Sequence, residues 1–204
     1  MKPWGLAERD AYRALPLCAH ELLADVPLHD VWRVELPGGD PDLTLLDLRA
    51  LMSWDQIREL NAVVRGLFRL RAGLGRWLRW DTPRRAAAAP SWLERVPPKL
   101  LERSVIPPGT SDGPFSVLYV HANEAVSEAR NATVHAFSVL ALERRSDGYR
   151  AFWAIYVAPV SRWTPFYMAL IDPFRHWLVY PALLKRAHHA WLAAWQNRPP
   201  QCRN

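Results

Sequence analysis

"NATVHAFSVLALERRSDGYRAFWAIYVAP", residues 131–159, decides the fold, because this stretch predicts two antiparallel strands joined by a tight turn. Apolar residues alternate with other residues on both sides of Asp147-Gly148, a dipeptide that favours a two-residue hairpin turn. A turn at these two residues pairs Leu140 with Ile155. The two strands then present two faces of different character.

One face of the predicted hairpin is aliphatic, and the other mixes aromatic and polar side chains. The aliphatic face is expected to lie inside the protein and carries Val134, Ala136, Leu140, Leu142, Trp153, Ile155 and Val157. The mixed face is either the wall of a ligand chamber or a contact surface, and it carries Thr133, His135, Phe137, Glu143, Arg145, Arg150, Phe152 and Tyr156.

Further strands are predicted on the N-terminal side of the hairpin. Residues 28–37, "LHDVWRVELP", alternate as a first strand and are followed by turn residues. Strand signals resume at 114–123, "PFSVLYVHAN", and again near 125–131. These segments predict a sheet that is mainly antiparallel.

A helical insert is predicted after the first strand. Residues 43–51 are predicted to form a second extended segment, although their pattern is also close to that of a helix. Ser53 and Gln56 fit a capping box, and residues 54–72 follow the helical period. Residues 81–114 contain two proline pairs that exclude a continuous helix, so they predict an irregular connection with one short helix.

The last long element is predicted to be helical between residues 164 and 196. Asp172 before Pro173 fits an N-cap, so a new helix is expected there, with a kink near Pro181. A stripe with spacings of three and four residues is expected to pack against the sheet, and it consists of Phe174, Trp177, Pro181, Leu184, His188, Trp191 and Trp195.

This order of elements predicts an α+β fold, in which an antiparallel sheet wraps around a long C-terminal helix in the helix-grip arrangement. The 204 residues suit one domain spanning 1–204. Its core is expected at 27–198, with 1–26 and 199–204 peripheral.

The composition is that of an ordinary globular protein, with 50% hydrophobic and 23% charged residues. Cys18 and Cys202 lack the spacing of a disulfide framework or a zinc site. Charges among the first residues argue against a secretory signal, and no apolar run reaches the roughly 18 residues of a membrane span. We therefore expect a cytoplasmic protein.

The net charge of +6 favours anionic partners only weakly. The predicted helix from residue 54 carries a stripe of arginines opposite its apolar side, within an arc of roughly 40°. The stripe is either an anionic-surface contact, such as for lipid headgroups, or a solvated face, and it consists of Arg58, Arg65, Arg69 and Arg76. No nucleic-acid motif accompanies it, so no nucleic-acid partner is expected.

Three stretches resemble a known bacterial family, domain of unknown function 2867. They are residues 60–81, 109–142 and 149–191, in which "NATVHAF" and "YMALIDPFR..VYPALL" are the most specific pieces. The resemblance implies a branch of the START-like, or SRPBCC, superfamily, whose members enclose an apolar cavity within a helix-grip fold. It brings no catalytic residues to this chain.

The leading functional hypothesis is the binding of a hydrophobic or amphipathic small molecule between the sheet and the C-terminal helix. We expect no cofactor. No metal site is expected either, because the adjacent His188 and His189 point about 100° apart on a helix and no two histidines are spaced four residues apart with a carboxylate in support. The candidate ligand-binding residues are Leu140, Trp153, Ile155, Val157, His135, Tyr156, Trp177, Leu184 and His188.

Two other functions remain open at this stage. One is an enzyme of cyclase or dehydratase type, with His135 or His188 and Tyr156 as acid and base. The other is a lipid-handling protein that lies on a membrane surface, since residues 163–184 are apolar but interrupted by charges. The histidines also have simpler roles, as hydrogen-bonded core or rim residues.

Overall fold

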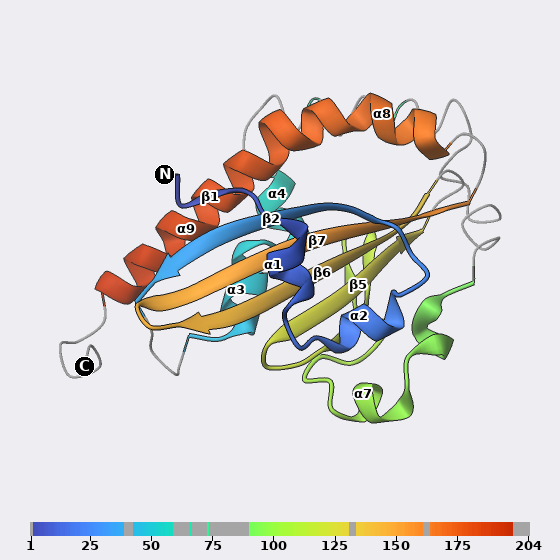
Figure 1. Ribbon diagram of the computed structural model, residues 1–204, viewed down its shortest axis with the longest axis horizontal. Helices are drawn as coiled ribbons and strands as arrows, with labels where there is room; N and C mark the ends of the chain where they lie inside the picture. The colour runs from blue at the N-terminus through green and yellow to red at the C-terminus, as the bar shows by residue number, and fades with distance from the viewer. Residues whose placement is uncertain are drawn as a thin grey trace.

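The computed structural model describes residues 2–38, 43–58, 90–130, 134–160 and 164–197, together with Gly66 and Gly73. In this part of the chain seven strands form one antiparallel sheet in the order β1-β2-β7-β6-β5-β4-β3 (Figure 1). With its helices, the sheet makes the α+β fold that the sequence predicts. The strands are β1 (Trp4–Leu6), β2 (Leu28–Pro37), β3 (Ser111–Asp112), β4 (Phe115–Val120), β5 (Glu124–Arg130), β6 (Val134–Arg145) and β7 (Gly148–Pro159).

The predicted strands are present, with one short additional strand at each edge of the sheet. β2 has the predicted bounds 28–37, and β4 and β5 fall on the segments predicted at 114–123 and near 125–131. The edge strands β1, which pairs with β2, and β3, which pairs with β4, were not predicted, because three and two residues are too few to show a period.

The hairpin of β6 and β7 turns one residue earlier than predicted. Arg145 pairs with Gly148, so that Leu140 lies opposite Trp153 rather than Ile155. Gly148 has φ +147°, and a Cβ atom there would lie 2.4 Å from the carbonyl oxygen of Leu36 in β2. Glycine is therefore needed where β7 meets β2, not inside the turn. The predicted register is wrong, but a shift of two residues leaves every side chain on its predicted face.

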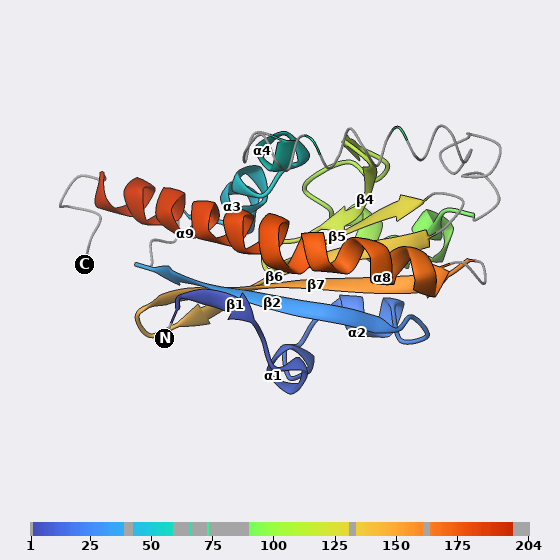
Figure 2. The ribbon, with the colours of Figure 1, turned by 90° about the horizontal axis from the view of Figure 1, so that it is seen from above.

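Helices cover both faces of the sheet, as Figure 2 shows for the larger ones. One face carries α3 (Leu45–Leu51), α4 (Trp54–Arg58), α8 (Thr164–Phe174), the π-helix η2 (Arg175–Val179) and α9 (Tyr180–Gln196). The other face carries α1 (Arg9–Arg13), α2 (Cys18–Leu22), the 3-10 helix η1 (Trp92–Arg95) and α7 (Pro98–Glu102).

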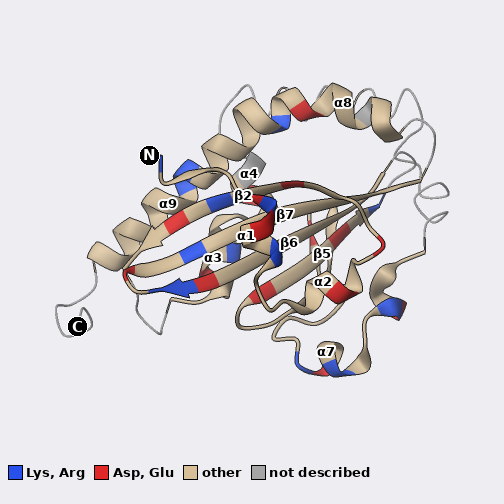
Figure 3. Cartoon of the chain, in the orientation of Figure 1, with Lys and Arg blue, Asp and Glu red and all other residues tan. Residues whose placement is uncertain are grey.

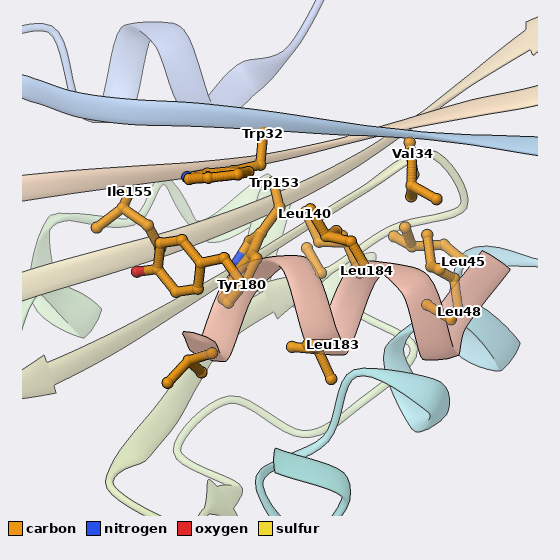
Figure 4. Packing of buried hydrophobic residues seen from close by; sticks show 14 of the residues in the cluster. Trp32, Val34, Leu45, Leu48, Leu140, Trp153, Ile155, Tyr180, Leu183 and Leu184 are labelled. Atoms are coloured by element: carbon orange, nitrogen blue, oxygen red, sulfur yellow. The ribbon is translucent and has the colours of Figure 1, made fainter. Parts of the chain in front are cut away.

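The first core lies between the sheet and the C-terminal helix. Trp153 packs edge-on against the ring of Tyr180, with 4.5 Å between ring centroids. Leu183 and Leu184 of α9 are fully buried in this core (Figure 4). Full burial of one leucine side chain contributes about 1.5–3 kcal/mol. The aliphatic face of the hairpin is therefore interior, as predicted.

The second core lies on the opposite face of the same hairpin. Phe137, Phe152 and Tyr156, which the sequence assigned to a mixed face, are buried there. Residues 12–26, which precede the core expected at 27–198, supply Tyr12, Leu23 and other apolar side chains to this cluster. The hairpin is thus covered on both faces.

Two buried glutamates attach the covering segments to the second face. Glu124 accepts hydrogen bonds from the backbone N–H groups of Cys18 and Ala19, at 3.0 and 3.2 Å, where α2 begins. Glu128 accepts one from the N–H of Trp92 at 3.1 Å, where η1 begins. A carboxylate is favoured at such a position because the first N–H groups of a helix have no partner within it.

Glu128 also binds His135, one of the predicted ligand-binding residues. The imidazole Nε2 lies 2.8 Å from a carboxylate oxygen of Glu128, and both side chains are buried. Burial alone would raise the pKa of the Glu128 carboxyl. Hydrogen bonds from His135, Ser91 and the Trp92 amide, with the charge of Arg130, outweigh burial and hold that pKa below its ordinary value.

The C-terminal helix departs from its predicted course. It already begins at Thr164 and continues through Pro173, so the N-cap predicted at Asp172 is wrong. The expected kink falls at η2, directly before Pro181, and α8 and α9 run in different directions in Figure 1. Pro181 has no N–H for the carbonyl group four residues earlier, which accounts for the wider π turn at this place.

The π turn changes which side chains face the sheet. An extra residue in one turn rotates the helix relative to the predicted stripe. Trp177 is 78% exposed and Phe174 is 43% exposed, so the prediction that they pack against the sheet is wrong. Leu184 and Trp191 of the predicted stripe are buried, as predicted. The other buried residues of η2 and α9 are Val179, Tyr180, Leu183 and Ala187.

The predicted helical insert is described only at its start. Residues 45–51, predicted to be extended but bordering on helical, form α3, which begins at a capping box made by Thr44 and Asp47. α4 begins at Trp54, as predicted, and most of the helix predicted at 54–72 lies outside the described residues. So do Arg65, Arg69 and Arg76 and the side chain of Arg58.

Replacing Glu128 by glutamine is expected to destabilise the protein in a pH-dependent way. Because the pKa of Glu128 is lowered in the folded state, its ionised carboxylate stabilises the fold at any pH above the ordinary pKa of 4.5. This contribution is lost as the pH falls from 4.5 through the lowered pKa of the folded state. Urea unfolding at pH 7 should show a loss of about 1–3 kcal/mol, which shrinks below the ordinary pKa.

The matched control is Glu143→Gln, because Glu143 pairs with the exposed Arg145 on the same hairpin. Its effect on the free energy of unfolding should stay below about 1 kcal/mol. Equal losses in the two variants, or a Glu128→Gln loss that does not change with pH, would contradict the account of Glu128.

Candidate ligand site

A cavity of about 60 Å³ lies between the sheet and the pair of helices α3 and α4. It opens on the same face of the sheet as the first core. Two of its residues, Leu140 and Trp153, were predicted to bind a ligand. The lining consists of Arg49, Met52, Trp54, Asp112, Phe115, Ala125, Ser127, Ser138, Leu140 and Trp153.

Two serines form the floor of the cavity. Ser127 of β5 and Ser138 of β6 lie directly opposite each other in the sheet. The indole N–H of Trp153, on the next strand, donates a hydrogen bond to the hydroxyl of Ser138 at 2.8 Å. A hydroxyl that accepts one hydrogen bond still has its own hydrogen to donate. The floor therefore offers polar groups within an apolar sheet face.

An ion pair holds the rim of the cavity. Arg49 of α3 lies 3.4 Å from one oxygen of Asp112 in β3, and the other oxygen accepts a hydrogen bond from the backbone N–H of Trp54 at 3.1 Å. Asp112 thus fixes the start of α4 over the floor.

Gly113 leaves room for the indole ring of Trp54 at the rim of the cavity. A Cβ atom at Gly113 would lie 2.2 Å from the indole, and its φ of +61° favours glycine. The indole also lies edge-on to Phe115, with 6.5 Å between ring centroids. The aromatic wall of the cavity therefore depends on a residue without a side chain.

The size of the cavity limits what it can hold. Sites that enclose a drug-sized molecule have volumes of roughly 300–1,000 Å³. A cavity of about 60 Å³ accommodates one small group, such as a carbonyl or carboxylate with a short apolar attachment. A larger molecule would have to displace Trp54 or Met52.

The predicted residues on the helix side are packed into the first core rather than around this cavity. Ile155, Val157 and Leu184 are buried among other apolar side chains. Tyr180 occupies the space beside Trp153. Trp177, predicted to line the ligand space, is exposed on the outer side of η2. Of the predicted set, the cavity brings together Leu140 and Trp153.

The three candidate acid–base groups are each bound to a protein partner. His188 Nδ1 donates a hydrogen bond to the backbone carbonyl of Glu35 in β2, on the face of the sheet that α9 covers. His135 binds Glu128 on the opposite face of the sheet, where the hydroxyl of Tyr156 donates to that of Tyr12 at 3.3 Å. Burial raises the pKa of Tyr156, while Tyr12 and the charge of Arg13 act in the opposite sense.

A second concave region of about 580 Å³ lies beside Tyr156, near the loop that leads into β2. Arg13, Ala24, Asp25 and Pro27 on its border are exposed, so it is an open surface groove. It lies on the opposite face of the sheet from the cavity under α4.

Most residues of the cavity were missed by the sequence analysis, although one signal was available. Ser138 interrupts the aliphatic face of the hairpin between Ala136 and Leu140, and a serine on an interior face needs a polar partner. Asp112, Phe115 and Arg49 gave no such signal, because their contacts join segments far apart in the sequence.

Comparisons with known proteins give one match. No curated protein and no solved structure matches the chain. The sequence model of one family matches residues 22–182, which is more than half of the chain and includes the whole sheet except β1. The resemblance seen in the sequence is thereby confirmed at the level of the family: the chain belongs to the family described as "Protein of unknown function (DUF2867)".

Proposed function

We propose that this protein is a START-like, helix-grip protein that binds a small amphipathic molecule in the cavity under α3 and α4. The observation that carries the proposal is the floor of that cavity, where two opposed serines and the indole of Trp153 interrupt an apolar sheet face. Ligand sites typically combine apolar walls with a few polar groups that fix orientation.

The polar groups define the part of the ligand that would enter first. Ser138 accepts from Trp153 and can donate its own hydrogen, and the Arg49 guanidinium stands at the rim. Both favour an oxygen acceptor, such as a carbonyl or carboxylate. Met52, Phe115 and Leu140 would cover the apolar part, and burial contributes roughly 25 cal/mol per Å².

The order of elements supports the START-like assignment. A first long strand, helices and then a run of antiparallel strands precede a long helix that returns to the same face of the sheet as α3 and α4 (Figure 2). This is the arrangement expected of a helix grip. The cavity lies on that gripping face, beside the terminal helix rather than beneath it.

Filling the floor of the cavity should abolish binding. In Ser127→Leu the added side chain would occupy much of the roughly 60 Å³. Native mass spectrometry of the purified protein should show a co-purified small molecule in the wild type and none in the variant. Isothermal titration with butyrate, a short amphipathic carboxylate that serves as the probe, should show at least a tenfold loss of affinity in the variant.

The matched control is Ser111→Leu, because Ser111 lies exposed in β3 beside the cavity without lining it. It should bind the probe as the wild type does. If Ser127→Leu keeps its fold by circular dichroism and binds the probe as tightly as Ser111→Leu, the proposed site is wrong.

A second candidate function, attachment to a membrane surface, is favoured by the outer side of α8 and η2. We name this surface the α8 stripe. Its side chains are 38–78% exposed, and the only charged residues among 164–179 are Asp172 and Arg175 (Figure 3). No helix in the described parts of the chain is long and apolar enough to cross a membrane. The α8 stripe consists of Phe166, Leu170, Phe174, Trp177 and Leu178.

An apolar helix side rich in aromatic rings suits the boundary between headgroups and acyl chains. The net charge of +6 favours anionic lipid. The proposed occupant of the α8 stripe is therefore the surface of an anionic bilayer.

Replacing Trp177 by serine should weaken vesicle binding at least fivefold, because the most exposed aromatic ring of the stripe would be lost. Flotation with phosphatidylserine-containing vesicles measures the bound fraction. Val105→Ser is the matched control, since Val105 is 59% exposed but lies elsewhere. Absence of wild-type flotation at low salt, or equal binding by the two variants, would remove this candidate function.

A further inference from the structure

Two histidines and two aspartates meet where the beginning of β2 packs against the π-helix. We name this group the His–Asp cluster, and it consists of His29, Asp30, Asp172 and His176. The cluster lies outside the cavity under α4. None of its four residues was predicted to have a function.

Two backbone irregularities bring these side chains together. The register of β2 against β7 shifts between Leu28 and Asp30, which places a β-bulge at His29. Neighbouring strand residues otherwise point to opposite faces, so the bulge is what lets His29 and Asp30 reach one place. On the helix, Asp172 and His176 are four residues apart, next to the π turn. Bulges of both kinds are frequent at functional sites.

The distances within the cluster suit a shared ion. His29 Nε2 lies 2.8 Å from Asp172 Oδ2 and 3.9 Å from Asp30 Oδ2, and His176 Nε2 lies 3.0 Å from Asp30 Oδ2. The ligand atoms of His29, Asp172 and His176 all lie within 4.8 Å of one another. Bonds of about 2.0–2.1 Å in a tetrahedral zinc site place ligand atoms about 3.3 Å apart, within this range.

Arg175 fixes both carboxylates from one side. Its guanidinium lies 2.6 Å from Asp172 Oδ1 and 3.2 Å from Asp30 Oδ2, and its Nε donates to the hydroxyl of Tyr180. Asp172 Oδ2 therefore faces the imidazoles. Outer hydrogen bonds of this kind orient metal ligands in proteins.

Asp30 provides an independent sign that a ligand is expected. The side chain is 5% exposed, yet its Oδ1 has no hydrogen-bond partner within the described structure. A buried carboxylate oxygen without a partner is costly, so such an atom calls for an ion or a hydrogen-bond donor. With neutral imidazoles, the two aspartates and Arg175 carry a net charge of −1, which a cation can compensate.

We propose that the His–Asp cluster binds one divalent transition-metal ion, Zn²⁺ in the first place, through His29, Asp172 and His176, with Asp30 as a fourth ligand. Two imidazole nitrogens and carboxylate oxygens are the donor set that zinc accepts. For Nε2 of a neutral imidazole to bind the ion, its proton moves from Nε2, where it now points at a carboxylate, to Nδ1 of the same ring. The ion would link β2 to the π-helix and thereby hold the C-terminal helix on the sheet.

The test is metal titration of untagged protein that has been dialysed against a chelator. Isothermal titration with Zn²⁺ should show one site per chain, and Co²⁺ should give the visible absorption of a four- or five-coordinate ion. In His29→Gln the affinity should fall by about tenfold or more, because one ligand nitrogen is lost while a donor to Asp172 is kept.

The matched control is His189→Gln, which removes an exposed histidine of α9 that is not part of the cluster. It should bind Zn²⁺ as the wild type does, with the same Co²⁺ spectrum. A wild type that shows no Zn²⁺ site at micromolar concentration would overturn the proposal, because the cluster would then be a hydrogen-bonded anchor alone. Equal affinity of folded His29→Gln and His189→Gln would overturn it as well. The wild-type Co²⁺ spectrum decides the question even if a variant fails to fold.

Discussion

Burial of the β6–β7 hairpin on both faces is the constraint on which the rest of the structure depends. Trp153 and Leu140 point to one core, and Phe137 and Phe152 point to the other. A sheet that is apolar on both sides has to be covered on both sides. The long C-terminal helix covers one face, and short helices from the beginning and the middle of the chain cover the other. Helices this short are not stable alone. Hydrogen bonds to the buried carboxylates of Glu124 and Glu128 therefore help to hold α2 and η1 in place.

The fold could be predicted from the sequence as far as it depends on local periodicity. Alternation with period two gave β2, the central hairpin and the division of its side chains between two faces. The turn at Asp147-Gly148 was wrong because the need for glycine comes from the contact between Gly148 and β2, which is distant in sequence. The prediction that Phe174 and Trp177 face the sheet was wrong because a single π turn changes the helical phase, whereas Leu184 and Trp191 of the same stripe are buried. The helices that cover the second face were not assigned to it, because the contacts that hold them, such as those of Glu128 with Ser91 and Trp92, join residues far apart in the sequence.

The candidate sites could likewise be predicted where they depend on local periodicity, but not where they depend on contacts between distant segments. Trp153 and Leu140 were found because they belong to a periodic face, and Ser138 could have been found as the polar exception on it. The rim at Arg49 and Asp112 and the His–Asp cluster consist of residues from separate elements. A search for histidines four residues apart misses such a cluster, because its histidines come from a strand and from a helix. Backbone irregularities, which have no strong sequence signal, position those side chains.

The pairing of β2 with β7 sets the order in which the chain can fold during its synthesis. The strand at 28–37 leaves the ribosome long before residues 148–159, its central partner, have been translated. In the same interval α2 lacks Glu124, which follows it by more than a hundred positions. The segment that contains α2 and β2 therefore emerges with apolar surface and no partner to pack against, so stable structure has to wait until β7 has been translated. Contacts this distant along the chain make for slow folding, and a nascent chain in that state is a substrate for chaperones that hold unfolded segments.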